Sequence, residues 1–395
     1  MLGNGLRHLA WALIALGVGV GVGEVGLRAV DFSYYWSLYK RVDPDRGWAP
    51  APGAEGWQRL EGKALVRINE AGVRDRLWPQ QKPAGTFRIA VLGDSFAEAV
   101  QVPIEQTFWF LLQGELDACD SLQGRQIEVL NFGVSGYSTA QQLLTLRHRV
   151  WPYQPDWVLL AFFHGNDVLE NSRAFDADPL RPYFVYRDGQ LVVDTAFRQS
   201  PSYRLRTAWY GRLGFALLDH SRLLQAIDLG TDVLGLWYRQ WQQRDEVEAA
   251  APREPGVDTR VYQEPQDSEW RAAWRVTEGI LEQMHEEVRA HGAEFFVVTL
   301  TTGAQVHPDP RFREQFQRRL GVSDLFYAER RIAALGQHAG FAVLNLAPEM
   351  QFFATFSGIW LHGFENSLPG IGHWNAAGHR LAATLIGKAI CPSDP

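Results

Sequence analysis

Ser95 is the first residue of the chain whose position suggests chemistry. It closes the segment Gly93-Asp94-Ser95, which directly follows an apolar run from Phe87 to Leu92. A serine at the turn from a buried strand into a helix lies beside backbone N–H groups and the positive end of the helix dipole, and both stabilise a developing oxyanion. Ser95 is therefore a candidate nucleophile, and Gly93 would permit the tight approach that such a turn requires.

A serine nucleophile needs a general base, and the segment GHWNAAGH near the end of the chain offers one. His373 in this segment comes just before a predicted terminal helix from Ala376 to Ile390. The distance along the sequence is no obstacle, because a nucleophile and its base need only meet within hydrogen-bonding reach in the folded chain. We expect His373 to take the proton of Ser95.

The elements that must position these residues follow from the alternation of apolar runs with helical patterns. Apolar runs occupy 87–92, 127–132, 157–163, 294–300 and 342–347, and helical patterns occupy 104–116, 140–150, 270–288, 310–340 and 376–390. Continuous apolar strands separated by helices predict an α/β fold with a parallel sheet that is covered on both faces. Polar residues end the first three strands, at 93–95, 131–136 and 164–167, and we expect them to converge in the crevice at the carboxyl edge of the sheet.

Four short segments, GDSF, NFGVSG, HGND and GHWNAAGH, together resemble the four ordered blocks of the SGNH or GDSL hydrolase family. The resemblance spans about residues 68 to 390 and includes a lead-in, INEAGVRDR, similar to that of envelope members. It implies a flavodoxin-like three-layer α/β/α sandwich with Ser95 as nucleophile and His373 as general base. It also implies an oxyanion hole made by the Ser95 N–H, the Gly136 N–H and the Asn166 side-chain amide.

The sequence departs from the family pattern at two positions. Family members usually carry an aspartate three residues before the base, where it orients the imidazole, but this chain has Gly370 there. A backbone carbonyl or an acid from elsewhere would take over, and Glu365 is the nearest candidate. His164 replaces the first glycine of the third block, where it would narrow the crevice or carry a proton. His362 lies close to the base in sequence and is a candidate to line the site.

The chain divides into three regions by composition. Residues 1–30 contain an apolar segment, LAWALIALGVGVGVG, that is either a signal peptide or an uncleaved single-pass anchor. We favour the anchor. The rest of the chain would then lie on the extracytoplasmic, periplasmic side of the membrane. Residues 31–86 are rich in proline and predict a connecting arm. Residues 87–395 form the predicted hydrolase domain, with an insertion at 170–266 that contains a hairpin-like segment, a helix through Leu223 and a polar tract at 245–258.

The two cysteines, Cys119 and Cys391, follow the first and the last helix of the implied sandwich. In the flavodoxin-like order these helices are parallel neighbours on one face, so their ends could meet and form a disulfide in an exported protein. Two unpaired thiols are the alternative interpretation. No cluster of histidine, aspartate or cysteine has metal-ligand spacing, so we predict neither a metal nor another cofactor.

The net charge of −7, with acids and bases interspersed, argues against nucleic acid as a partner. We expect a serine-dependent hydrolase or O-acyltransferase of acyl esters. The membrane-tethered layout resembles envelope proteins that add or remove acetyl groups on exopolysaccharides, such as the alginate acetylation proteins, and the 15 tryptophans could stack on sugar rings. Two alternatives remain open: an esterase of lysophospholipids or other lipids, and a glycan-binding or assembly component with weak catalysis.

Overall fold

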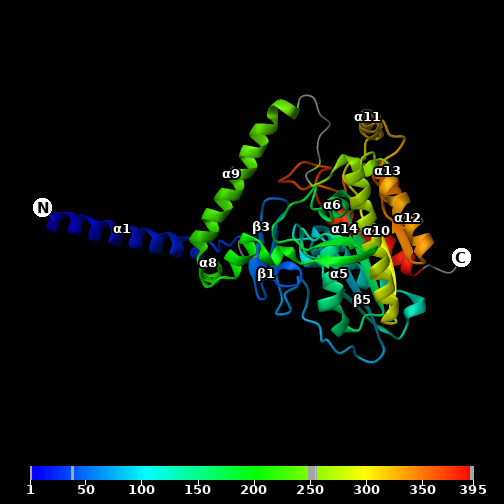
Figure 1. Cartoon of the computed structure of the whole chain (residues 1–395), viewed down its shortest axis with the longest axis horizontal. Helices are drawn as coiled ribbons and strands as arrows, with labels where there is room; N and C mark the ends of the chain where they lie inside the picture. The colour runs from blue at the N-terminus through cyan, green and yellow to red at the C-terminus, as the bar shows by residue number, and fades with distance from the viewer. Residues whose placement is uncertain (1, 37–39, 248–253, 255, 392–395) are drawn as a thin grey trace.

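A parallel sheet of five strands forms the centre of the protein, of which the computed structural model describes residues 2–36, 40–247, 254 and 256–391 (Figure 1). The strands lie in the order β6-β5-β7-β10-β11, with bounds Gln126–Asn131, Thr86–Gly93, Trp157–Phe162, Glu294–Thr299 and Ala342–Asn345. Numbered along the chain this is 2-1-3-4-5, the flavodoxin-like order. The predicted fold class is therefore confirmed.

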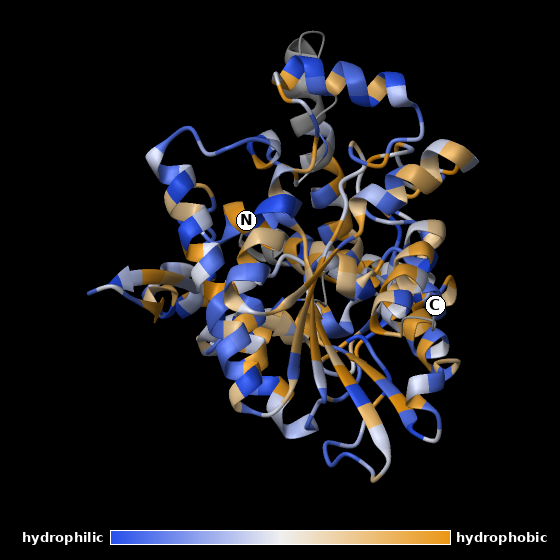
Figure 2. Ribbon diagram, turned by 90° about the vertical axis from the view of Figure 1, so that its right-hand side faces the viewer, coloured by the Kyte–Doolittle hydropathy of each residue, from blue (hydrophilic) through white to orange (hydrophobic). Residues whose placement is uncertain are grey.

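Helices cover both faces of the sheet, as the continuous apolar strands require. One hydrophobic core lies beneath α5, α10 and α12, with bounds Thr139–Thr145, Ser268–Ala290 and Tyr327–Ala339. A second core lies on the other face beneath α4, α13 and α14, with bounds Phe108–Asp117, Ala347–Ser357 and Ala376–Ile390. Figure 2 shows the fan of central strands mostly in the hydrophobic colour and hydrophilic residues on outer helix surfaces.

Three helical regions differ from the sequence prediction. The predicted helix at 140–150 ends early as α5 and continues as a π-helical turn over Leu146–Val150. The predicted pattern at 310–340 is two helices, α11 over Pro310–Leu320 and α12, because Gly321 ends α11 in the left-handed conformation. Helix α13 was not predicted, and it follows β11 after a single residue, Leu346.

Residues 31–86 contain ordered structure rather than only an irregular connection. Two antiparallel hairpins occupy this segment, β1 with β2 and β3 with β4, over Lys40–Asp43, Gly47–Pro50, Glu55–Gln58 and Ala64–Arg67. Trp48 and Val66 of these strands are buried in a small core with Val134 and Tyr137 of the sandwich. Strands of four residues are too short for hydrophobic alternation to reveal them, which explains why the sequence suggested only an arm.

The insertion folds as a hairpin followed by helices. Strands β8 and β9 pair over Tyr183–Arg187 and Gln190–Asp194, in the segment that was predicted to be hairpin-like. Helices α7, α8 and α9 follow over Pro201–Thr207, Trp209–His220 and Arg222–Val247, and the last of them contains Leu223. Of the polar tract predicted at 245–258, residues 248–253 and 255 lie outside the described part of the chain.

Helix α1, over Leu2–Ala29, projects from the body of the molecule (Figure 1). Its segment Arg7–Ala29 is long and apolar enough to cross a membrane, and it is not buried by any other part of the protein. A signal sequence would pass the same test of length and composition, so both interpretations of this segment stand.

A disulfide joins Cys119 to Cys391, with their Cα atoms 5.9 Å apart. The bridge connects the chain just after α4 to the chain just after α14, and these two helices pack side by side. Of the two interpretations of the cysteines, the structure shows the bonded one.

Candidate active site

Strand β5 delivers Ser95 to the carboxyl edge of the sheet. Ser95 begins the single helical turn α3, Ser95–Glu98, and Asp94 caps this turn by accepting a hydrogen bond from the Phe96 N–H at 2.9 Å. A Cβ atom at Gly93 would lie 2.8 Å from the Cβ of Ala97 and 3.1 Å from the Cβ of Ala161. Glycine is therefore needed where the strand turns sharply into α3 beside β7.

Ser95, His373 and Glu61 form a continuous chain of hydrogen bonds. The Ser95 Oγ lies 2.8 Å from the His373 Nε2, and the His373 Nδ1 lies 2.6 Å from the Glu61 Oε2. The backbone N–H of His373 donates to the other oxygen, Glu61 Oε1, at 2.7 Å. This is the arrangement of nucleophile, base and orienting acid that activates a serine.

The carboxylate that orients the base is Glu61 and not Glu365, which corrects the sequence prediction. Glu365 is exposed and lines a neighbouring cavity. Glu61 lies in the turn between β3 and β4, and sequence reasoning missed it because this hairpin precedes the first of the four blocks. An acid with no fixed spacing from its partner carries no recognisable signal in one sequence.

The loop between α13 and α14, residues 358–375, carries His373 and is called the histidine loop. Two glycines explain why the acid comes from outside this loop. Gly370 has a positive φ of 75°, and a Cβ atom there would lie 2.3 Å from the Trp360 ring, so an aspartate does not fit at this position without movement of the loop. Gly372 has a φ of 86°, and a Cβ atom there would lie 2.2 Å from the Glu61 Oε1. The absence of a side chain at Gly372 thus leaves room for the Glu61 carboxylate.

The pair of His373 and Glu61 is electrostatically coupled. Burial acts to lower the pKa of His373, but the charge and hydrogen bond of Glu61 outweigh this effect and raise it above the ordinary value. Burial conversely acts to raise the pKa of Glu61, and the opposite charge and hydrogen bonds of His373 outweigh it, so this pKa is lowered. The pairing therefore favours the imidazolium form of His373 next to the Glu61 carboxylate.

The predicted oxyanion-hole residues come from the ends of three neighbouring strands. Gly136 follows β6 with a φ of 75°, and Asn166 lies in the short helix α6, His164–Glu170, which follows β7. The Asn166 Nδ2 donates to the Asp94 Oδ2 at 3.2 Å, so the amide is held next to the serine turn. Neither the Ser95 N–H nor the Gly136 N–H makes a hydrogen bond to another residue in the described part of the chain, which leaves both donors for a ligand.

Acid groups around Asn166 are deeply buried. Burial raises the pKa of Asp94 to about 6, against the hydrogen bond from the Phe96 N–H. Asp167 is also fully buried; its Oδ2 accepts from the Phe163 N–H at 2.9 Å and its Oδ1 accepts from the Gln142 side chain at 3.2 Å. These bonds fix the loop that carries Asn166.

The histidines near the base support the loop and do not face Ser95. The His362 Nδ1 lies 2.6 Å from the Gly372 carbonyl oxygen and its Nε2 lies 2.9 Å from the Thr301 hydroxyl. Burial lowers the pKa of His362 to about 4, so the ring is neutral. His379 accepts a hydrogen bond from the Phe108 N–H at 3.3 Å, and burial lowers its pKa to about 3. Both side chains support the loop, and His362 also lines the cavity described below.

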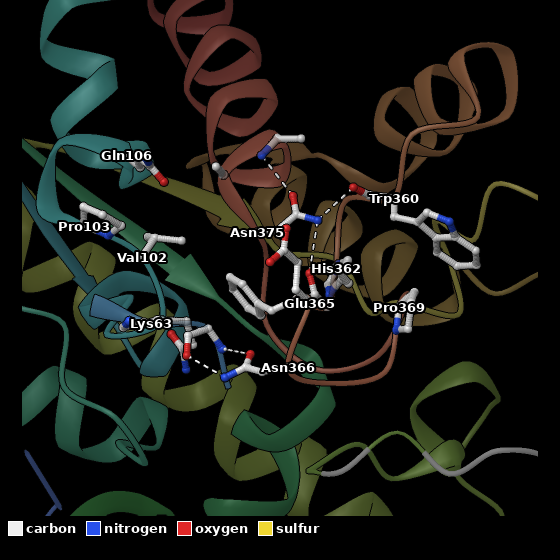
Figure 3. Close-up of a pocket in the computed structure, with 16 residues that line it drawn as sticks. Lys63, Val102, Pro103, Gln106, Trp360, His362, Glu365, Asn366, Pro369 and Asn375 are labelled. Atoms are coloured by element: carbon white, nitrogen blue, oxygen red, sulfur yellow. Dashed lines mark hydrogen bonds between the residues drawn. The ribbon is translucent and has the colours of Figure 1, made fainter. Parts of the chain in front are cut away.

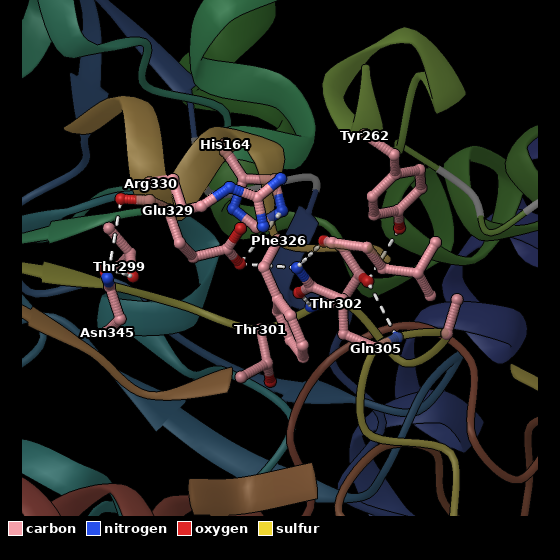
Figure 4. A network of polar contacts seen from close by, with 12 residues as sticks. His164, Tyr262, Thr299, Thr301, Thr302, Gln305, Phe326, Glu329, Arg330 and Asn345 are labelled. Carbon is pink, nitrogen blue, oxygen red and sulfur yellow. Dashed lines mark hydrogen bonds and ion pairs between the residues drawn. The ribbon is translucent and has the colours of Figure 1, made fainter. Parts of the chain in front are cut away.

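His164 points into the interior of the domain, where Figure 4 shows it next to Glu329. Its Nε2 lies 3.8 Å from the Glu329 Oε1, and neither ring nitrogen has a hydrogen-bond partner among the described residues. Burial lowers the pKa of His164 to about 3. A fully buried neutral ring neither narrows the crevice nor carries a proton for Ser95, which corrects that expectation.

The insertion also reaches the histidine loop. The Glu254 carboxylate accepts hydrogen bonds from the Gly303 N–H at 2.9 and 3.0 Å, and the backbone of Gly372 also donates to it. Burial raises the pKa of Glu254 to about 7. The acid therefore joins the loop after β10 to the loop that holds the base.

A cavity of about 730 Å³ lies between the β3–β4 turn and the loop that precedes α14 (Figure 3). Ser95 and His373 do not line it, but Gly62, next to Glu61, and Asn375, two residues after the base, do. Polar side chains face it together with the ring of Trp360: Lys63, Gln106, Glu365, Asn366 and Asn375. The structure shows no group of three or more metal-ligating side chains among the described residues.

Comparisons with known proteins give structural similarity only. No family model matches the chain, and no curated protein matches it. The acetyl xylan esterase AlAXEase has a TM-score of 0.39 at 12% identity over 77% of this chain and 100% of its own. The acetylxylan esterase Axe2 from Geobacillus stearothermophilus has a TM-score of 0.38 at 12% identity over 78% and 95%. TesA has a TM-score of 0.35 at 14% identity over 77% and 98%.

Proposed function

We propose that this chain is a serine-dependent hydrolase or O-acyltransferase of the SGNH type, which acts on acyl esters of envelope carbohydrate. The observation that carries the proposal is the hydrogen-bonded chain from Ser95 Oγ through His373 to Glu61, with distances of 2.8 and 2.6 Å. A helix cap or a buried structural serine would not need a base that is itself oriented by a carboxylate. This chain of bonds is what activates a weakly nucleophilic hydroxyl.

The reaction proceeds in two displacements. His373 Nε2 takes the proton of Ser95 as the oxygen attacks the ester carbonyl, and the protonated base then gives this proton to the leaving alkoxide. The N–H groups of Ser95 and Gly136 and the amide of Asn166 hold the tetrahedral oxyanion. Water releases the acyl group in hydrolysis, and a sugar hydroxyl takes it in transfer. Glu61 stabilises the imidazolium in both steps.

The choice of a carbohydrate substrate rests on the cavity between the β3–β4 turn and the loop that precedes α14. Its lining combines the half-exposed ring of Trp360 with amide and charged side chains, and such a surface stacks on one face of a sugar and hydrogen-bonds its hydroxyl groups. The similar acetylxylan esterases act on an acetylated polysaccharide by their own names. Attachment through α1 would hold the enzyme at the membrane on the extracytoplasmic, periplasmic side, where a disulfide also persists.

Labelling with a fluorophosphonate tests the nucleophile directly. We expect the wild-type chain to be modified at Ser95 and the Ser95→Ala variant to remain unmodified. The His373→Ala variant should react more slowly than wild type by at least about 100-fold. Mass spectrometry of the modified peptide identifies the site. A folded wild-type sample that does not react would exclude the enzyme and favour a glycan-binding component.

The substrate class is tested by comparing kcat/KM for an acetylated oligosaccharide, p-nitrophenyl acetate and a lysophospholipid. Acetylated oligosaccharides should be turned over with a higher kcat/KM than p-nitrophenyl acetate, and release of acetate in the presence of a free sugar acceptor separates hydrolysis from transfer. A preference for lysophospholipid over both would support the lipid esterase instead.

A further inference from the structure

We propose that helices α8 and α9 of the insertion rest on the surface of the lipid bilayer next to α1, and that an arginine-lined pocket beside them binds the anionic phosphate of lipid headgroups. The contact surface consists of Trp209, Tyr210, Leu213 and Leu217 of α8 with Ile227 and Leu234 of α9. This inference rests on the proposed membrane attachment through α1.

Helix α8 carries an apolar stripe that faces away from the protein. Trp209, Leu213 and Leu217 repeat every four residues and are 75%, 51% and 52% exposed. Tyr210 adjoins this stripe and is 52% exposed. Residues at this spacing share one face of a helix, and a contiguous apolar face of this kind is unusual on a surface that meets only water.

Helix α9 turns a similar face outward. Its inner side is bound to the N-terminal segment, because the Tyr34 hydroxyl donates to Asp232 at 2.7 Å and the Tyr34 N–H donates to Gln225 at 3.3 Å. Ile227 and Leu234 lie two helical turns apart on the opposite side and are 56% and 65% exposed. Helix α9 packs against both α8 and α1, so the two apolar faces lie near the same end of α1.

This surface adjoins the place where α1 meets the body of the molecule. The Glu24 carboxylate of α1 accepts hydrogen bonds from the Arg222 and Leu223 N–H groups at 3.0 Å each, so it caps the first turn of α9. Arg28 of α1 donates to the carbonyl oxygen of His220, the last residue of α8. Figure 1 shows α8 and the start of α9 at the base of α1. A bilayer crossed by α1 would therefore reach these helices first.

A positively charged pocket of about 310 Å³ lies on another face of α8, between this helix and β1. Arg41, Arg206 and Arg212 line it with Phe215, and Asp219 is the one acid, paired with Arg41. The Arg41 Nη1 is buried and has no hydrogen-bond partner among the described residues. Buried donors of this kind normally have a hydrogen-bond partner. A headgroup phosphate offers two oxygens that can accept the two parallel N–H bonds of a guanidinium group.

Three features favour a bilayer over a protein as the occupant. The surface lies next to the apolar helix α1, its aromatic side chains are of the type that sits at the membrane interface, and the pocket beside α8 is basic. Basic groups next to an apolar face are attracted by anionic lipids.

A single fluorescent label on the full chain tests the contact. Both native cysteines are used in the disulfide, so a cysteine introduced by Leu213→Cys can be labelled alone with an NBD maleimide. Phe356→Cys is the matched control, because Phe356 is apolar and 77% exposed and belongs to α13. Helix α13 lies on the side of the molecule away from α1 (Figure 1). Each labelled chain is placed in phosphatidylcholine vesicles, with or without phosphatidylglycerol, that contain a spin-labelled lipid quencher.

We expect the label at 213 to be quenched at least about three-fold more strongly than the label at 356, since only the former would reach the acyl boundary. Adding Arg206→Gln or Arg212→Gln should lower the ratio of docked to undocked chains about five-fold per arginine in vesicles with phosphatidylglycerol, and not in those without it. Equal quenching of the labels at 213 and 356 would overturn the proposal. A label at 213 that is not quenched in the vesicles but is shielded from a water-soluble quencher in native membranes would also overturn it, because this result would indicate a protein partner.

Two further measurements separate this proposal from those before it. Flotation of the full chain with the vesicles reports on attachment through α1, and failure to float overturns the contact surface as well. Fluorophosphonate labelling of the same samples reports on Ser95 and does not depend on the lipid. A chain that floats and reacts but shows no quenching at 213 refutes the contact surface alone.

Discussion

At the residue scale, the base is oriented by an acid from a different part of the chain than the family pattern suggests. Glu61 accepts hydrogen bonds from both the ring and the backbone N–H of His373, so one carboxylate fixes the tautomer, the ring direction and the loop. Gly370 and Gly372 leave the space in which this contact forms. The hydrogen-bonded chain therefore depends on the absence of side chains at these two glycines as much as on Ser95, His373 and Glu61.

Replacing Glu61 tests its role as a positioning residue. Glu61→Gln removes the negative charge that raises the pKa of His373, so this pKa should fall and the acid limb of the kcat/KM profile should move to lower pH. The plateau value of kcat should drop about 100-fold to 10,000-fold, because the imidazolium loses its partner. Glu365→Gln is the control, and a shift of the acid limb in that variant would contradict the assignment. The pH profile with a small ester measures both effects.

Gly372→Ala tests whether the space beside Glu61 matters. The new Cβ atom would collide with the Glu61 carboxylate, so we expect a loss of kcat of about 100-fold from the misplaced base. Gly340→Ala is matched in backbone conformation, since both glycines have a φ of 86°, but it has open space around it. Both variants should lose about 1 kcal/mol of stability from the strained backbone. Equal activity of the two variants would show that the contact at Gly372 is unimportant.

At the scale of elements, the β3–β4 hairpin contacts the loop that carries His373. Asn366 receives a hydrogen bond from the Gly62 N–H at 2.8 Å and donates to the Gly62 carbonyl oxygen at 2.9 Å, which attaches the β3–β4 turn to the loop before the base. Arg74 donates from its guanidinium group to the Glu98 and Ala99 carbonyl oxygens, behind the serine turn. Residues 31–86 thus hold the nucleophile and the base in register.

The disulfide is predicted to support stability rather than catalysis. The double variant Cys119→Ser with Cys391→Ser should lower the free energy of unfolding by about 2–5 kcal/mol, because the bridge closes a very long loop in the unfolded chain. Cys391 follows the end of α14, a helix of 15 residues whose start is next to His373, so the bridge lies about 20 Å from the base. Urea unfolding measures the loss, and wild type with a reductant is the control. A fall in the fluorophosphonate labelling rate of the folded variant would contradict this separation.

At the scale of the whole molecule, burial raises the pKa of several acids, although one of them, Glu170, pairs with Arg181 at 3.3 Å. Burial raises the pKa of Glu329 to about 8 and that of Glu170 to about 7. The Glu329 Oε1 accepts a hydrogen bond from the Gln305 side chain, but its Oε2 has no partner among the described residues. Such groups make the stability of the fold depend on pH.

Glu329→Gln should make stability less sensitive to a rise in pH from about 4.5 to about 8. The folded chain keeps the Glu329 proton up to about pH 8, whereas the unfolded chain releases it near 4.5. The contribution of this group is therefore present below pH 4.5 and is lost as the pH rises to about 8, by about 1.4 kcal/mol per pH unit. Urea midpoints at acidic and at mildly alkaline pH should differ less in the variant than in wild type. Glu314→Gln, at an exposed acid, should leave the difference unchanged, and the same difference in all three chains would refute the argument.

The alternation of apolar runs and helical patterns in the sequence determined the α/β class with a parallel sheet, and the polar residues at the strand ends and before the last helix pointed to Ser95 and His373 as a pair. The flavodoxin-like strand order was implied by the resemblance of four segments to the SGNH hydrolase blocks. These features are local, because an apolar strand, the polar residues at its end and the cap of the following helix are neighbours in the chain. Their pattern can therefore be recognised in the sequence. The terminal helix was predicted with its observed bounds, Ala376–Ile390, for the same reason.

The tertiary structure alone decided which acid contacts His373. It also decided how residues 31–86 contribute to the candidate active site. Glu61 and His373 are 312 positions apart, and their contact depends on a hairpin of four-residue strands, an asparagine that holds its turn and two glycines that make room. The pairing of Cys119 with Cys391 likewise depends on where two helices end in space. Contacts of this kind are fixed by packing between distant segments, and a single sequence carries no periodicity or spacing from which packing could be inferred.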